Sequence, residues 1–191
     1  SSAPVISGSV NLAIDGLVAL SGSFAVSREV QVDGTVKTTK ILIAAADIDA
    51  FLGVNEGEED EIGIRVTGAQ FGLVLFSTKN TASPGSGSTS YAITASGSAG
   101  FVGLDGLVLY GSVGIQVNNT GKVVNESIVV PGDDGDIAVD IVFPTAEKIL
   151  AFQGDVVLKI GQTDSNGNGV LEQSDQAVFE LAGTIGFRKG P

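Results

Sequence analysis

Cysteine, histidine, methionine and tryptophan are all absent from this chain of 191 residues. Without cysteine it forms no disulfide and offers no thiol nucleophile, and without histidine it lacks the usual general base near neutral pH. The same absences exclude a zinc site built from Cys and His ligands. A chain without cysteine or methionine has no easily oxidised side chain, which fits exposure to an oxidising environment.

Positive charge is also scarce. The chain has 10 Lys and Arg against 22 Asp and Glu, and its formal net charge is −12. A surface of this sign repels nucleic acids and anionic lipids and attracts cations. No uninterrupted apolar run reaches the ~18 residues of a membrane-spanning helix, and residues 1–10 lack the basic residues and apolar core of a signal peptide. We therefore expect no nucleic-acid partner and no membrane insertion.

Long helices are not expected, because the chain has 27 Gly and its apolar residues alternate with a period of two. The alternating runs, rich in Val, Ile, Thr and Phe, are residues 10–14, 24–32, 62–76, 137–143 and 178–187. We expect residues 1–191 to form a single all-β module, an antiparallel β-sandwich built from repeated hairpins, with a β-solenoid or β-roll as the second choice. Short helical turns are expected only at 44–53 and 144–152, where Asp47 and Thr145 are suitable caps.

Three segments repeat one pattern, in which two alternating apolar strands flank a turn and a glycine follows in the second strand. They are LAIDGLVALSGSFAV (12–26), VGLDGLVLYGSVGI (102–115), and LKI (158–160) with VFELAGTIGF (178–187). The shared glycines are Gly22, Gly111 and Gly183. The first two copies turn at Asp15–Gly16 and Asp105–Gly106, a strong hairpin signal because a type I′ turn needs two residues with φ > 0. Common ancestry explains the three copies best; independent hairpin chemistry in a glycine-rich chain is the alternative.

The third copy carries an insert, DSNGNGVLEQSD (164–175), where the others need only a short turn. Its spacing, D-x-N-x-N-G-x-x-x-x-x-D, places alternate oxygen ligands around a hard cation and a glycine at the sharp turn. The predicted ligands are Asp164, Asn166, Asn168, the carbonyl of Val170, Glu172 and Asp175. We predict that the insert binds Ca²⁺ with a Kd on the order of 10⁻⁴ M, because only three carboxylates serve the ion. The motif resembles the calcium loop of EF-hand and especially dockerin modules, but strands are expected to flank it here; a plain Asn- and Gly-rich loop is the alternative.

Two further acidic stretches stand out. Residues 55–61, NEGEEDE, carry five carboxylates, and residues 131–140, PGDDGDIAVD, include Asp133, Asp134 and Asp136. Both are expected to be solvated turns, and weak cation binding is the alternative for each.

Catalysis is not expected. Without His or Cys the remaining options include a carboxylate pair, a Ser–Lys dyad or a Thr nucleophile, and the chain has no G-x-S-x-G, P-loop or dinucleotide-binding motif. A calcium-dependent carbohydrate-binding module is the main alternative to a structural role. However, the chain offers only Tyr91 and Tyr110, and no Trp, as amphipathic aromatic platforms for a sugar.

Residues 40–53 and 91–121 resemble modules that recur in very large bacterial surface proteins, the calcium-dependent adhesins exported by type I secretion. The resemblance implies an extracellular location, tandem arrays, rigidity in calcium and no catalytic residues. Its implied partners are neighbouring copies of the module and a cell-surface or glycan ligand. A non-catalytic structural or adhesive repeat is therefore the leading hypothesis. Gly22 and Gly183 lie 161 residues apart, which suggests the repeat period, and we expect the two termini at opposite ends of an elongated domain.

Overall fold

A computed structural model describes residues 4–14, 18–58, 60–83, 85–104, 106–132, 135–163, 165 and 175–190. The strands are β1 (Val5–Ile14), β2 (Val18–Asp33), β3 (Val36–Val54), β4 (Ile62–Asn80), β5 (Gly87–Val102), β6 (Leu107–Asn118), β7 (Val124–Val130), β8 (Ile137–Phe143), β9 (Ile149–Thr163) and β10 (Gln176–Lys189). Within these residues the structure has no helix, and so none long and apolar enough to cross a membrane.

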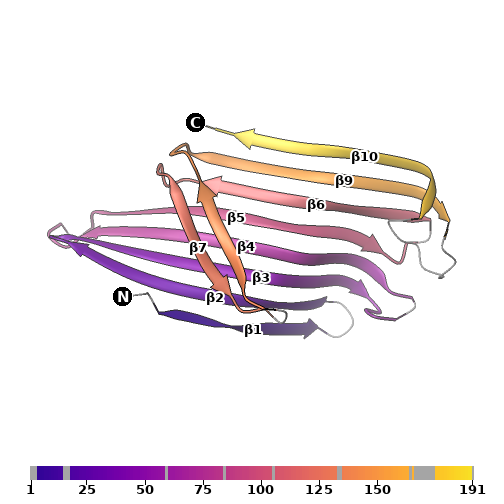
Figure 1. The fold of residues 1–191 in the computed structure, drawn as a ribbon, viewed down its shortest axis with the longest axis horizontal. Coiled ribbons are helices and arrows are strands. Elements are labelled where there is room, and N and C mark those ends of the chain that lie inside the picture. The colour runs from indigo at the N-terminus through magenta and orange to yellow at the C-terminus, as the bar shows by residue number, and fades with distance from the viewer. Residues whose placement is uncertain are drawn as a thin grey trace.

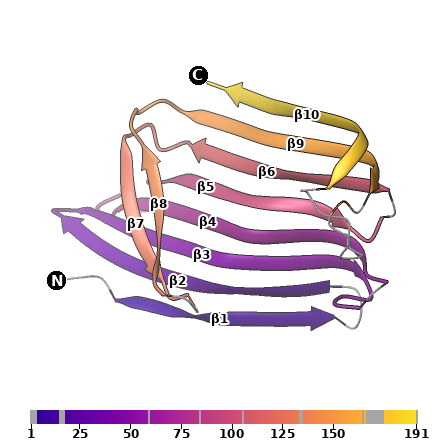
Figure 2. The same ribbon diagram turned by 45° about the vertical axis from the view of Figure 1, so that its right-hand side comes forward.

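Eight strands form one antiparallel sheet in the order β1-β2-β3-β4-β5-β6-β9-β10, and β7 and β8 form a separate two-stranded sheet. The chain leaves the large sheet only between β6 and β9, where it builds the β7–β8 hairpin that lies obliquely across one face (Figure 1, Figure 2). The predicted all-β antiparallel fold is confirmed. Its two layers are very unequal, and the large sheet is open, with β1 and β10 as its edges.

All three predicted hairpins are present as antiparallel strand pairs, namely β1–β2, β5–β6 and β9–β10. Residues 15–17 and Asp105 lie outside the described residues. At the second hairpin the N–H of Leu107 donates to the carbonyl oxygen of Leu104 at 3.1 Å, and Gly106 has φ of 68°. The left-handed backbone of Gly106 is the conformation for which glycine is suited.

The two expected helical turns are absent. Residues 44–53 belong to β3, and 144–148 form no helix before β9 begins. Asp47 has φ of 50° and lies where the register between β3 and β4 shifts, between Ala45 and Ile48. The alanine-rich segment is therefore a bulged strand, because pairing on both sides overrides its helical propensity.

Neighbouring rows of residues across the large sheet point to opposite faces, because side chains alternate along each strand. One row reads Gly8, Phe24, Ala45, Phe71, Ala95, Ile115, Phe152 and Phe187. The row two residues away reads Ile6, Val26, Ile43, Leu73, Ile93, Val117, Leu150 and Lys189. Between them, on the other face, the row reads Ser7, Ala25, Ala44, Gly72, Thr94, Gln116, Ala151 and Arg188. The first two rows define an apolar face, and the third belongs to a small-residue face.

The β7–β8 hairpin packs on the small-residue face. The buried core consists of Ala25, Leu42, Ala44, Ala46, Val74 and Ala92 from the sheet, and Val124, Ile128, Val130, Val139, Ile141 and Phe143 from the hairpin. Small sheet residues let the two layers approach closely. A Cβ atom added to Gly72 would lie 2.7 Å from Cγ1 of Ile141 and 3.1 Å from Cγ1 of Val139.

No described segment covers the apolar face in the same way. Both described strands outside the large sheet lie on the other face. Five side chains of the apolar face are markedly exposed: Ile6 (70%), Ile115 (40%), Leu150 (45%), Phe152 (38%) and Phe187 (57%). The central side chains of the same rows are half-buried, because they pack sideways against one another within the sheet.

Both described ends of the chain lie at the same end of the strands. Ile6 and Lys189 belong to one row that crosses the sheet from β1 to β10, and Figure 1 shows both termini in the same half of the view, at opposite edges of the sheet. The expectation of termini at opposite ends of the domain is therefore wrong along the strand direction.

Candidate functional site

The insert predicted to bind calcium connects β9 to β10. Five of its predicted ligands lie outside the described residues: Asp164, Asn166, Asn168, Val170 and Glu172. The sixth, Asp175, is 1% exposed. Its Oδ1 accepts hydrogen bonds from the N–H of Ser165 at 3.0 Å and from the Oγ of Ser165 at 2.8 Å. These bonds hold the two ends of the insert together, which is the closure that a twelve-residue calcium loop needs; the calcium site itself stays a prediction.

Lys159 on β9 lies beside the insert. Its Nζ donates to the carbonyl oxygen of Asp175 at 3.1 Å and lies 3.7 Å from Oε2 of Glu180, and the residue is only 7% exposed. A buried ammonium needs such partners, because removing it from water is costly. A positive charge beside the predicted calcium site disfavours the binding of a divalent cation.

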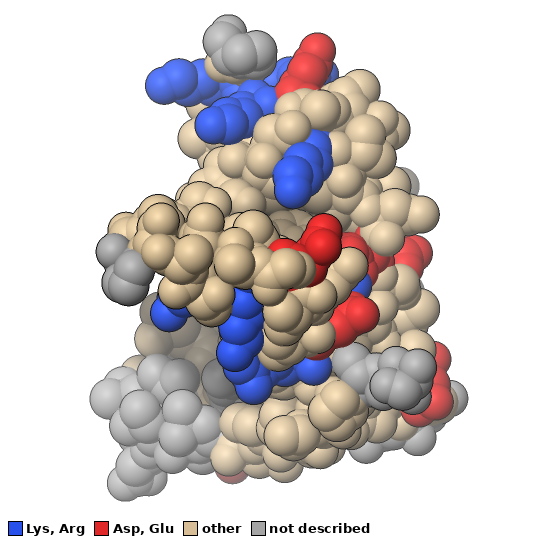
Figure 3. All heavy atoms as spheres, turned by 90° about the vertical axis from the view of Figure 1, so that its left-hand side faces the viewer, with Lys and Arg blue, Asp and Glu red and all other residues tan. Residues whose placement is uncertain are grey.

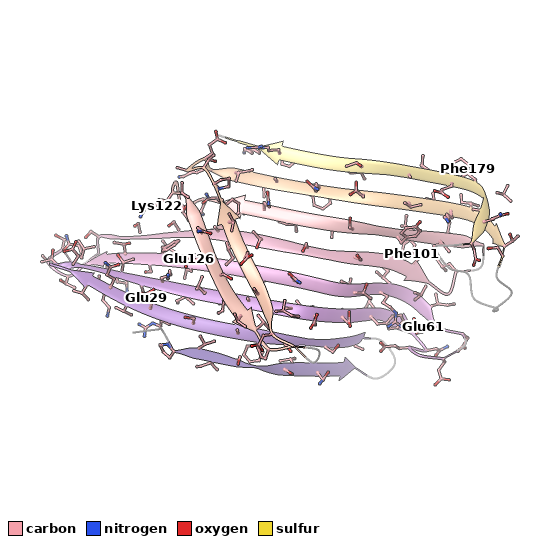
Figure 4. All side chains as sticks on the ribbon, in the orientation of Figure 1. Glu29, Glu61, Phe101, Lys122, Glu126 and Phe179 are labelled. Atoms are coloured by element: carbon pink, nitrogen blue, oxygen red, sulfur yellow. The ribbon has the colours of Figure 1, made fainter. Side chains whose placement is uncertain are left out.

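In the stretch 55–61, Asp60 and Glu61 are engaged by nearby donors, and Glu59 lies outside the described residues. Glu61 accepts hydrogen bonds from Nη2 of Arg65 at 2.6 Å and from the N–H of Gly57 at 2.6 Å, and Nδ2 of Asn55 donates to Asp60 at 2.7 Å. Burial by itself raises the pKa of the Glu61 carboxyl, but the hydrogen bond from Arg65, followed by that from Gly57, outweighs it and lowers this pKa below its usual value. Figure 4 shows Glu61 at the end of the strands away from the termini.

In the third acidic stretch, Asp133 and Asp134 lie outside the described residues. Asp136 borders a depression of about 750 Å³ together with Asp47 and Asp49. Asp49 accepts a hydrogen bond from the N–H of Gly68 at 2.9 Å. Across the described ranges, no group of three or more acidic side chains is arranged to hold a metal ion.

A groove of about 1060 Å³ lies on the small-residue face beside the hairpin. Residues from five strands of the large sheet, β4, β5, β6, β9 and β10, line it, among them Thr94, Ser96, Gln116, Gln153 and Arg188. These hydroxyl, amide and guanidinium groups supply donors and acceptors of the kind that sugar hydroxyls need. Its volume lies just above the usual range for ligand sites, about 300–1,000 Å³. This groove is the candidate ligand site of the described chain.

Charges of both signs are mixed near the hairpin. Figure 3, which views the end of the molecule near the termini, shows Lys and Arg side chains beside Asp and Glu. Nζ of Lys40 lies 3.0 Å from Oε2 of Glu126 on β7 and 3.1 Å from Oε2 of Glu29 on β2. Figure 4 shows Glu126 beside β7 and Glu29 on the sheet below it. Partial burial by itself lowers the pKa of Lys40, but the bonds and charges of Glu126 and Glu29 outweigh it and raise this pKa. The hairpin is thus tied to the sheet by charge as well as by apolar packing.

Sequence reasoning missed the groove and a second glycine in each repeated hairpin. The groove residues are far apart in the chain, and only the strand alternation hints at which share a face. The shared glycines Gly22, Gly111 and Gly183 pair with Val10, Ala99 and Val156. Two positions before each of these three partners the chain has a second glycine: Gly8, Gly97 and Gly154. The tripeptide Ser–Gly–Ser at 7–9 and 96–98 was the available signal.

No protein-family model, no curated protein and no solved structure matches this chain.

Proposed function

We propose that the chain is a non-catalytic structural module of a large bacterial surface protein, and that neighbouring copies of the module are its principal partners. The apolar face of the large sheet carries this proposal. It crosses eight strands, and exposed apolar patches of this extent mark surfaces that associate with another molecule. In an assembly, a second layer must therefore cover it.

Size and charge favour a second copy as this layer. Eight strands of about ten residues give a face of roughly 1,100 Å² at the usual strand spacing and rise, more than the ~800 Å² that each partner buries in a standard interface. The two rows that define the apolar face contain one charged residue, Lys189, and it lies at the β10 edge. Two twisted sheets with few charged residues on their facing surfaces pack face to face at about 10 Å, and a twofold axis makes such an interface self-complementary.

The cellular context comes from the sequence. The resemblance of 40–53 and 91–121 to adhesin modules suggests an extracellular location on the bacterial surface, and the acidic, cysteine-free composition fits it. In this proposal calcium binds the insert at 164–175 and stiffens the connection between β9 and β10. Closure of the insert by Asp175 and Ser165 supports this role.

The experiment compares two lysine substitutions at consecutive residues of β9. Phe152 belongs to the apolar face and Gln153 to the small-residue face, and both are exposed. We expect the chain to self-associate at micromolar concentrations in sedimentation experiments, Phe152→Lys to abolish the face-to-face association, and Gln153→Lys to leave it unchanged. A wild-type chain that stays monomeric at hundreds of micromolar would overturn the proposed packing.

The second candidate function is calcium-dependent carbohydrate binding, which the polar groove favours. Both residues border the groove, but the same two variants separate the hypotheses, because the side chain of Gln153 lies on the face of the groove and that of Phe152 on the opposite face. Binding to immobilised glycans that is lost in Gln153→Lys, and retained in Phe152→Lys, would support the sugar-binding role.

A further inference from the structure

The three repeated hairpins have the same internal register. The marker glycines Gly22, Gly111 and Gly183 pair with Val10, Ala99 and Val156 in the preceding strand. Four residues before each glycine, the pairs Ile14–Val18 and Ile160–Phe179 occupy equivalent places in the first and third hairpins. By this register β1, β5 and β9 are equivalent first strands, and β2, β6 and β10 are equivalent second strands.

Within one chain, the large sheet already contains a direct junction between two copies of the repeated hairpin. The second strand of one hairpin, β6, pairs antiparallel with the first strand of the next, β9, from Leu107–Ile160 to Asn118–Ile149. Gly111 lies opposite Val156 in this junction, and Val156 lies opposite Gly183 on its other side. The two open edges of the sheet are a first strand, β1, and a second strand, β10. In the β6–β9 junction, too, a second strand pairs with a first strand.

The glycines show that the second strands are adapted to an outer neighbour. A Cβ atom at Gly111 would lie only 2.2 Å from the carbonyl oxygen of Asp155 in β9, and one at Gly22 would lie 3.3 Å from Cα of Ile48 in β3. In both cases the contact is with the neighbouring strand outside the hairpin. At Gly183 an added Cβ would meet nothing within 4 Å, so nothing described in this chain requires a glycine there.

Neither open edge is strongly protected against pairing. β1 contains no charged residue and no proline over Val5–Ile14, and proteins commonly use such residues to block sheet edges. β10 has Glu180, Arg188 and Lys189 near its two ends, but residues 181–187 are uncharged. A free strand edge presents backbone N–H and C=O groups that another strand can satisfy.

We propose that β10 of one copy pairs antiparallel with β1 of a second copy, in the register that β6 and β9 use. Transferred from that junction, the pairs are Phe179 with Ile14, Gly183 with Val10, Thr184 with Ser9 and Ile185 with Gly8 of the second copy. The interface joins different edges, so it does not close on itself and extends into one continuous sheet. The inference deepens the proposed structural role by naming a second surface between copies, distinct from the apolar face.

Cysteine cross-linking tests the pairing, because the chain has no cysteine of its own. Thr184→Cys and Ser9→Cys are made in separate proteins, both also carrying Phe152→Lys so that the apolar face does not contribute. Mixed under mild oxidation, they are expected to form mainly the mixed disulfide, since directly opposed strand residues have a suitable Cα separation. Disulfides formed mainly between two molecules of the same variant would overturn the pairing. An equal yield of the mixed disulfide with Ser7→Cys in place of Ser9→Cys would overturn its register. Either outcome leaves the face-to-face packing of the proposed function untouched.

Two alanine substitutions in β10 test the role of glycine. Gly183→Ala meets no atom within its own chain, but its equivalent Gly111 has no room for a Cβ beside the neighbouring strand. Gly186→Ala is the matched control, because its equivalent Gly114 would make only 3.9 Å contacts. We expect Gly183→Ala to lower the mixed-disulfide yield about tenfold with an unchanged melting temperature, and Gly186→Ala to leave the yield unchanged. Equal yields for the two variants would overturn the proposed register.

Discussion

Lys40 of the large sheet and Glu126 of the β7–β8 hairpin are 86 residues apart in the chain, and their side chains form an ion pair of 3.0 Å between the two layers. Both side chains are about three-quarters buried, with 26% and 22% exposed. Glu29 completes a chain of three charges at 3.1 Å from the same Nζ. The small second layer is thus fixed at one point by a directional interaction, which apolar packing alone does not supply.

Lys40→Met is expected to lower the free energy of unfolding by about 1–2 kcal/mol at neutral pH, because it leaves Glu126 partly buried without its cation. The matched control is Lys37→Met on the same strand, where the side chain is exposed. Urea unfolding of both variants measures the difference. An equal loss in the two would show that the Lys40 ion pair adds nothing to stability.

The contribution of Lys40 should disappear in alkali. Its pKa is raised in the folded chain, so its stabilisation is fully present below the unfolded value of about 10.4 and is lost as pH rises through the folded value. The stability difference between wild type and Lys40→Met should therefore stay constant from neutral pH to about pH 10 and then shrink. Unfolding curves across this range check the sign, and a difference that grows in alkali contradicts it.

Gly72→Ala is expected to destabilise the chain by about 1–3 kcal/mol through overpacking. Its Cβ would lie 2.7 Å from Cγ1 of Ile141, which is fully buried and cannot move aside. Gly114→Ala is the control on the same face, with nearest contacts of 3.9 Å. Thermal unfolding of the two variants distinguishes a tight interlayer contact from a general intolerance of substitution on this face.

The strands and hairpins were predictable because alternation and turn chemistry are local signals. The expectation of a helical turn at 44–53 was wrong, because pairing with strands on both sides of β3 holds this segment extended. Asp47 marks a bulge there. The oblique path of β7–β8 and the Lys40–Glu126 pair depend on contacts between distant segments, for which no local pattern exists. The apolar face was implicit in the alternation, but the alternation does not show that the second layer has only two described strands, both on the other face.

The insert at 164–175 should give a calcium-dependent melting shift on the order of 5–10 °C when calcium exceeds its Kd a hundredfold. Asn166→Ala with Asn168→Ala should remove most of this shift, because both are predicted ligands with neutral side chains. Asp175→Ala should also lower the melting temperature in chelator, since its buried carboxylate holds Ser165. If the double variant keeps the full response to calcium, the ion binds elsewhere.

The lowered pKa of Glu61 predicts a contribution to acid stability. A carboxyl whose folded pKa is depressed stabilises the chain above its unfolded value of about 4.3, and this stabilisation is lost as pH falls through the folded value. Glu61→Gln should therefore cost at most about 1 kcal/mol at pH 7, because Arg65 is 37% exposed. The cost should vanish in acid. Glu58→Gln, at an exposed residue of the same turn, should have no effect at either pH.

Two copies fused directly, without an added linker, should extend across the strands. Ile6 and Lys189 lie in one row at opposite edges of the sheet. In the proposed β10–β1 pairing, the end of β10 lies beside the start of β1 in the next copy, and a loop of a few residues can join neighbouring antiparallel strands. Eight strands at the usual spacing then lengthen the particle by about 38 Å per copy. Because the connection between β9 and β10 is at the other end of the strands from Lys189, this junction should not need calcium. Small-angle scattering should give this increase in maximum dimension with and without chelator, and collapse on chelation would favour a calcium-held joint over strand pairing.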